Sequence, residues 1–264
     1  MDVVARPPGA AVRVEPTPRR VRGVFAGQTV VDSRRTLILF EQGHLPVYYF
    51  PIEDVRADLL EPSDRRTTCP RKGEATYGSI RVGDRVAQDA MWRYEEPIDE
   101  CPDISGHVAF YWRALDSWWE EDDEVFVHPR DPYHRVDVLR SSRHVRVEVD
   151  GQALADTRRP LLLVETGLPP RWYVPRADVR LDRMTPTDTT TACPYKGFAS
   201  YFSAQVGDAR YDDIAWTYVT PVPECPKIEQ AMCFFTERDA VTLTVDGEEQ
   251  ARPETHWKHG VRDR

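Results

Sequence analysis

The sequence has no excess of positive charge, no long apolar run and few glycines. Its 264 residues contain 35 Lys and Arg against 44 Asp and Glu, which gives a formal net charge of −9 at pH 7. Nucleic-acid binders neutralise phosphates with clustered cations, so we predict no nucleic-acid partner for this acidic chain. The mean hydropathy is −0.56, and the apolar runs fall far short of the roughly 20 residues of a membrane helix, so we predict no membrane partner.

Several familiar motifs are also missing. With only 14 glycines, the chain has neither Gly-x-Gly-x-x-Gly nor Gly-x-x-x-x-Gly-Lys-Ser/Thr, whose backbone N–H groups cradle phosphates. It has no Cys-x-x-Cys, and its seven His do not stand at ligand spacing, so we predict no metal site and no cofactor. The N-terminus lacks the apolar stretch of a signal peptide, and five cysteines are an odd number. We therefore expect reduced thiols and a cytoplasmic protein.

The chain does contain a long internal repeat. When it is shifted by 124 residues, Gly27 falls on Gly151 and Phe110 on Phe234, with 38 identities over 84 positions and no gap. Solenoid repeats run about 20 to 50 residues, so a period of this length indicates two globular domains of the same fold. The boundaries we predict are an N-terminal arm over 1–19, a first repeat over 20–119, a linker over 120–143, a second repeat over 144–250 and a polar tail over 251–264.

Local patterns within each repeat are typical of β-strands. Val145, Val147 and Val149 alternate with charged residues, which predicts a strand with one buried face. Asp150-Gly151 follows directly, and an Asp-Gly pair between strand patterns predicts a two-residue hairpin turn. The 22 prolines leave few uninterrupted stretches for a helix, with one short helical candidate in each repeat, around Ile104 and Ile228. We predict an all-β protein with little helix.

Four motifs occur twice, in the same order, and carry a family resemblance. In the second repeat they are Tyr173-Val-Pro175, Asp178-Val-Arg180, Cys193-Pro-Tyr-Lys196-Gly197 and Trp216-Thr-Tyr218. Each repeat resembles the domain of unknown function 427, a family that also carries a nucleotidyltransferase label and has no established activity. The resemblance implies two small β-tent domains, a fold whose other members bind ligands in a cleft between two sheets. The phosphate-binding loops noted above are absent, so the residues give the nucleotidyltransferase label no support.

A small-molecule pocket is the site that these residues favour. Aromatic rings with a few polar groups are typical of ligand pockets. The predicted lining is Glu165, Tyr173, Asp178, Arg180, Thr191, Cys193, Lys196, Tyr201 and Trp216, with Glu41, Tyr49, Thr67, Cys69, Lys72, Tyr77 and Trp92 at the matching positions of the first repeat. Asp178, Arg180 and Asp182 alternate, so in one strand they would share a face as a pocket wall or an ion-pair row. Arg71 of the first repeat is replaced by Tyr195 in the second, which indicates that the two copies bind different ligands.

Three functions remain open on the sequence alone. The first is a binding protein that holds a small molecule without chemistry. The second is an enzyme that uses Cys193 as a nucleophile, activated by Lys196, or Glu165 and Lys196 as an acid–base pair. The third is a structural or protein-interaction module. Against the nucleophile stands the ordinary role of cysteine as a small buried hydrophobe. The identity of the ligand and the oligomeric state do not follow from these patterns.

Overall fold

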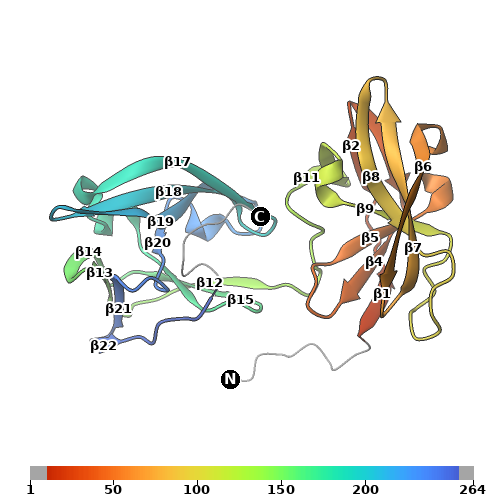
Figure 1. The fold of residues 1–264 in the computed structure, drawn as a ribbon. Helices are drawn as coiled ribbons and strands as arrows, with labels where there is room; N and C mark the ends of the chain where they lie inside the picture. The colour runs from red at the N-terminus through yellow and green to blue at the C-terminus, as the bar shows by residue number, and fades with distance from the viewer. Residues whose placement is uncertain (1–10, 256–264) are drawn as a thin grey trace. The chain divides into compact units, whose positions relative to one another are not determined.

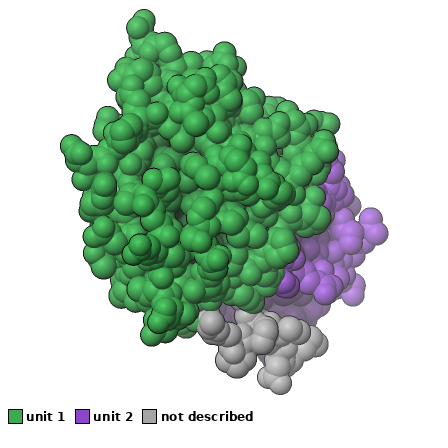
Figure 2. Space-filling model, turned by 90° about the vertical axis from the view of Figure 1, so that its right-hand side faces the viewer, with its two compact units in different colours: residues 1–131 green, residues 132–264 purple. Residues whose placement is uncertain are grey.

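The computed structural model describes residues 11–255, and these residues form an all-β protein, which confirms the prediction (Figure 1). Helical segments within this range are 3-10 turns of three residues, at Ile52–Asp54, Ala57–Leu59, Trp112–Ala114, Arg176–Asp178, Leu181–Arg183 and Pro226–Ile228. None of the helices in the described part of the chain has the length and apolar character needed to cross a membrane. The chain divides into two compact units, residues 1–131 and 132–264 (Figure 2).

Unit 1 contains a seven-stranded and a four-stranded antiparallel sheet. The larger sheet has the order β1-β4-β5-β9-β8-β7-β6, and the smaller has the order β11-β10-β2-β3. The strands are β1 (Val12–Pro16), β2 (Val21–Phe25), β3 (Gln28–Ser33), β4 (Leu37–Glu41), β5 (Val47–Pro51), β6 (Leu60–Cys69), β7 (Gly73–Val82), β8 (Arg85–Arg93), β9 (His107–Phe110), β10 (Ser117–Glu120) and β11 (Asp123–Val125).

Unit 2 repeats these strands in the same order. Its sheets are β12-β15-β16, β14-β13-β21-β22 and β17-β18-β19-β20. The strands are β12 (Val136–Arg140), β13 (Val145–Val149), β14 (Gln152–Thr157), β15 (Leu161–Glu165), β16 (Arg171–Tyr173), β17 (Met184–Cys193), β18 (Gly197–Val206), β19 (Ala209–Pro221), β20 (Met232–Phe234), β21 (Val241–Val245) and β22 (Glu248–Glu249). Because β12 begins 124 residues after β1, the structural repeat extends beyond the stretch that shows sequence identity.

The predicted hairpin between β13 and β14 is present. Val145, Val147 and Val149 are buried, as the alternation requires. Asp150 and Gly151 have φ values of 51° and 76°, the left-handed conformation that both central residues of a type I′ turn adopt. Glycine takes this conformation at little cost, and Asp is among the side chains that tolerate it.

The sheets of each unit bury apolar side chains on both faces. In β4 and β5 of unit 1, Ile38 and Phe50 pack into one core cluster, whereas Leu39 and Tyr49 pack into another on the opposite face. Because successive side chains of a strand point to opposite faces of the sheet, alternate residues pack into two separate cores. The second of these clusters also contains Tyr77, and Trp92 packs against it, both of which recur in the second repeat.

Two expectations about the ends of the repeats are corrected. The segment 120–143, expected to be a linker, contains β11 and β12, because Val125 and Val138 are buried among its charged residues. The N-terminal arm expected over 1–19 contains β1, which pairs with β4; its residues 1–10 lie outside the described range. The short helix expected near Ile104 is absent, and the one near Ile228 is a single 3-10 turn.

Candidate functional site

A buried Glu–Lys pair lies at the centre of the candidate site in unit 1. Glu41 is the last residue of β4, and Lys72 lies in the turn that joins β6 to β7. This turn is held by two backbone hydrogen bonds, from Lys72 N to Cys69 O at 3.3 Å and from Ile98 N to Lys72 O at 3.2 Å. Gly73 follows with φ of +104°, a conformation that L side chains rarely adopt. Lys72 Nζ donates a hydrogen bond to Glu41 Oε2, and only 8% and 11% of the two side chains are exposed.

The same pair recurs in unit 2 with one more partner. Lys196 Nζ donates to Oε2 of Glu165. His134 Nε2 lies 2.9 Å from the other carboxylate oxygen, Oε1, and the His134 ring stacks on Tyr195 with 3.9 Å between centroids. In unit 1 a longer ion pair reaches Glu41 Oε1 from Arg71, whose Nη1 is 3.6 Å away. The carboxylate of unit 2 is therefore hydrogen-bonded on both oxygens.

The charges of the unit 2 pair stabilise each other. Burial disfavours ionised Glu165, but the His134 hydrogen bond and the Lys196 charge outweigh it and lower its pKa below the ordinary range. Burial also disfavours charged Lys196, yet Cys193 and Glu165 raise its pKa above the ordinary value. Glu165 and Lys196 therefore form an ion pair at neutral pH, rather than a neutral acid and base.

The retained aromatic residues form two hydrogen-bonded pairs beside the ion pair. In unit 1, Trp92 Nε1 donates to Tyr49 OH at 3.2 Å, and Thr67 Oγ1 lies 2.8 Å from Tyr77 OH. The corresponding distances in unit 2 are 3.1 Å for Trp216 to Tyr173, and 2.7 Å for Thr191 to Tyr201. The structure therefore gathers these predicted residues around each Glu–Lys pair, which agrees with their retention in both repeats.

The cysteines divide into two groups by burial. Cys101, Cys225 and Cys233 are buried, and desolvation raises the pKa of Cys101 and raises those of Cys225 and Cys233 to about 11 and about 12. These thiols are protonated at neutral pH. Cys69 and Cys193 are half-buried at the ends of β6 and β17. Among residues 11–255, no group of three or more His, Cys, Asp and Glu is arranged to hold a metal ion.

The Asp-Val-Arg motifs do not lie with the other predicted residues. Asp178 belongs to a 3-10 turn and accepts hydrogen bonds from Thr157 and Arg159, while Arg180 forms a pair with Asp182. The condition for a shared strand face is not met, because Asp178 and Asp182 lie in two successive 3-10 turns. Asp178 and Arg180 therefore form local ion pairs, as Asp54 does with Arg35 and Arg56 with Asp58.

A pocket of about 550 Å³ opens beside the ion pair of unit 1. It lies where β5 and β9 separate, since these strands pair only at Phe50–Val108 and Pro51–His107. Its walls are mostly aromatic, and Glu41 and Lys72 are among its polar groups. The lining consists of Leu39, Glu41, Gly43, His44, Leu45, Pro46, Val47, Tyr48, Tyr49, Lys72, Tyr77, Trp92, Tyr94, Phe110, Tyr111, Trp112, Trp118, Val127, His128 and Pro129.

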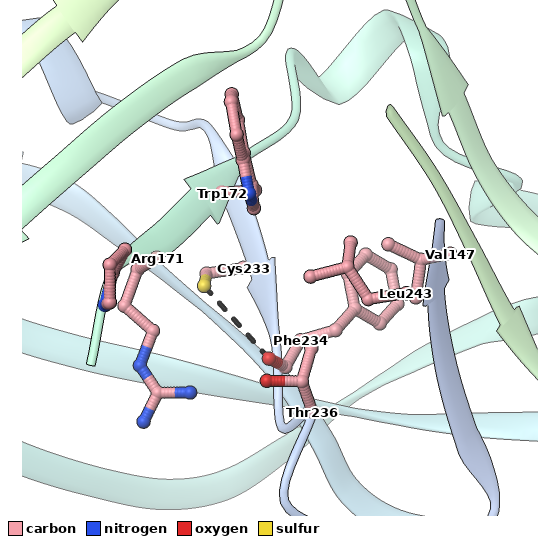
Figure 3. Close-up of a pocket in the computed structure, with 8 residues that line it drawn as sticks. Val147, Arg171, Trp172, Cys233, Phe234, Thr236 and Leu243 are labelled. Atoms are coloured by element: carbon pink, nitrogen blue, oxygen red, sulfur yellow. Dashed lines mark hydrogen bonds between the residues drawn. The ribbon is translucent and has the colours of Figure 1, made fainter. Parts of the chain in front are cut away.

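Side chains fill the corresponding gap in unit 2. Arg171 stands where unit 1 has Val47, and Glu237 stands where unit 1 has Arg113. Arg171 Nη1 donates to Glu237 Oε2 at 2.9 Å, its Nη2 donates to Oε1, and both side chains are buried. The pocket that remains beside Arg171 and Cys233 holds about 10 Å³, about the volume one water needs (Figure 3).

Sequence reasoning missed the residues that decide this difference. Val47 and Arg171 differ between the repeats, so a search for retained residues passed over them. His134 lies outside the aligned stretch and inside the segment expected to be a linker. The signal that could have found them is a pair of replacements between the repeats. Arg171 replaces the neutral Val47, and Glu237 replaces the cation Arg113, so that an Arg and a Glu able to pair appear together in unit 2.

The comparison with known families agrees with this duplicated architecture. Residues 13–121 and 137–249 each match the family described as a domain of unknown function (DUF427). No curated protein matches the sequence. One match falls in each compact unit, and together they cover most of the chain. The chain belongs to the domain of unknown function 427 family and contains two of its domains in tandem.

Proposed function

We propose that this protein binds a small organic molecule in the pocket of unit 1. The observation that carries the proposal is the pocket of about 550 Å³, which falls within the roughly 300–1,000 Å³ of typical small-molecule sites. Most of its walls are apolar or aromatic, and a few charged and polar groups stand among them. Sites of this composition gain affinity from the rings and specificity from the polar groups.

The second repeat supports this proposal by contrast. In unit 2 the buried Arg171–Glu237 pair stands at the positions of Val47 and Arg113, and the pocket beside it holds about 10 Å³. An open space lined by aromatic rings in unit 1 is therefore a feature of its particular side chains. We assign binding to unit 1 and a mainly structural role to the matching residues of unit 2.

The test is to fill the pocket with the side chains of unit 2. Full-length protein is screened by ligand-detected NMR against a library of aromatic and heteroaromatic fragments. We expect fragments to bind the wild type and to lose at least about tenfold in affinity, roughly 1.4 kcal/mol, in the double variant Val47→Arg/Arg113→Glu. Arg56→Ala is the matched control, because Arg56 forms an exposed pair with Asp58 outside the pocket.

Two results would contradict the proposal. The first is that no fragment binds the wild type. The second is that hits bind the filled variant as tightly as the wild type while circular dichroism shows that the variant is folded.

A further inference from the structure

Lys72 presents unused hydrogen-bond donors to the pocket of unit 1. It is the one Lys or Arg among the twenty lining residues, and its side chain is 8% exposed. An ammonium group carries three N–H donors. Among the described residues, Glu41 Oε2 accepts one of them, and the ring of Tyr94 lies 5.9 Å from Nζ. Because buried donors are almost always matched, the remaining N–H groups favour a ligand that brings oxygen acceptors.

The charges around the pocket favour an anionic group. Glu41 is accompanied by two cations, Lys72 and Arg71.

The cluster at Glu41 thus holds two cations and one carboxylate, although the whole chain carries a net charge of −9. In unit 2, Tyr195 replaces Arg71, so the cluster at Glu165 lacks that cation. A local excess of positive charge at a partly enclosed pocket attracts anions.

The aromatic side chains of the pocket indicate the shape of the part of the ligand that does not carry the anionic group. Trp92 and Tyr111 have centroids 4.7 Å apart with planes tilted by 45°, and Tyr77 lines the same space. Aromatic side chains in this arrangement offer both faces and edges to a flat ring. We infer that the ligand of unit 1 is a planar aromatic acid, whose anionic oxygens accept hydrogen bonds from Lys72 and whose ring packs against these side chains. This inference rests on the proposed binding function.

Three probes that differ in one group test the inference on full-length protein. They are indole-3-acetate, its neutral amide indole-3-acetamide and the cationic amine tryptamine, with affinities measured by ligand-detected NMR titration. We expect the acetate to bind at least about tenfold more tightly than the amide, because hydrogen bonds to charged groups are the stronger ones. Tryptamine should bind most weakly of the three.

Variants then locate the charge preference. Lys72→Met should abolish the preference for acetate over amide, and Arg71→Tyr should reduce it without breaking the buried pair. The second variant keeps the test decisive if Lys72→Met fails to fold. Arg56→Ala removes one cation from the same unit, outside the pocket, and should preserve the preference.

The outcomes separate this inference from the function on which it rests. If the amide or tryptamine binds as tightly as the acetate, and Val47→Arg/Arg113→Glu abolishes binding, the acid is excluded while the pocket function stands. If the acetate preference survives both Lys72→Met and Arg71→Tyr, the assignment to this cluster is wrong. If none of the probes binds, or binding is unaffected by filling the pocket, both proposals fail.

Discussion

Each unit has its own polar centre, formed by a buried Glu–Lys pair and a Trp–Tyr hydrogen bond. The two units differ in the space beside this centre. Both place a buried Lys on a Glu carboxylate, and both pair a Trp with a Tyr hydroxyl. Unit 1 leaves about 550 Å³ next to this centre, whereas unit 2 places the Arg171–Glu237 pair there and leaves about 10 Å³. The same Glu–Lys pair and Trp–Tyr hydrogen bond can therefore stand beside an open pocket or beside a space filled by side chains.

The difference teaches which residues hold the fold and which create the site. Residues common to both repeats form the strand ends, the turn before Gly73 or Gly197 and the polar centre. Residues that differ, such as Val47 and Arg171, stand where the open space of unit 1 is replaced by side chains in unit 2. Residues retained in both repeats therefore build the common polar centre, whereas residues that diverge beside it set the size of the neighbouring space.

The largest expected effect comes from breaking the filling pair of unit 2. Glu237→Ala leaves Arg171 buried without its carboxylate, and removing one partner of a buried pair costs about 3–5 kcal/mol. We expect the free energy of unfolding of unit 2 to fall by about this amount, measured from the hydrogen exchange of unit 2 peptides in full-length protein.

The matched control is Arg113→Ala, at the same position in unit 1. It should change the stability of unit 1 by no more than about 0.5 kcal/mol, as surface substitutions usually do. Equal effects of the two variants would show that the Arg171–Glu237 pair is not what distinguishes the units.

A smaller effect is expected at the centre that both units share. Lys196→Met leaves Glu165 buried with His134 alone, and we expect a cost of about 3 kcal/mol to unit 2. Lys72→Met should cost unit 1 about 1–2 kcal/mol less, because water in the pocket can solvate the carboxylate of Glu41. Urea unfolding followed by hydrogen exchange of each unit measures both values. Identical losses would mean that the pocket does not hydrate Glu41.

Much of the fold could be predicted from the sequence, because its signals are local or repeated. The gap-free register predicted two like units, and the alternation around Val145 with Asp150-Gly151 predicted a hairpin that the structure contains. Within the segment expected to be a linker, a short strand at 125–127 was considered and β11 ends at Val125, whereas β12 was missed because it is short and Val138 is its one buried residue. Such short strands form because they pair with strands distant in the sequence, and the local sequence pattern does not show this pairing.

The sequence predicted which residues gather at the Glu–Lys pair of the candidate site, but it did not predict the open volume beside them. Retention of Glu41, Lys72 and Tyr49 in the second repeat indicated that they lie together. The Asp-Val-Arg motif was retained as well, yet it forms ion pairs in 3-10 turns, because retention does not separate structural from ligand-facing charges. The open volume depends on how β5 and β9 diverge and on which side chains reach across, which are three-dimensional facts.

The smallest effect concerns His134, the extra partner of the unit 2 carboxylate. His134→Ala removes the hydrogen bond to Glu165 Oε1, and we expect unit 2 to lose about 1–2 kcal/mol at pH 6. Unit 1 should be unaffected, and its peptides provide the internal control. The variant also makes the surroundings of Glu165 more like those of Glu41.

The pH dependence of this loss gives the sharper test. The pKa of Glu165 is lowered in the folded state, so its ionisation contributes stability that is complete above its unfolded pKa of about 4.3 and is lost as pH falls through the folded value. Without His134 the folded pKa rises toward the ordinary one, which removes part of that contribution. The difference between wild type and His134→Ala should therefore be present at pH 6 and shrink below about pH 4, as hydrogen exchange of unit 2 peptides would show. A difference that stays constant down to pH 3 would indicate that His134 acts by packing on Tyr195 rather than through the carboxylate.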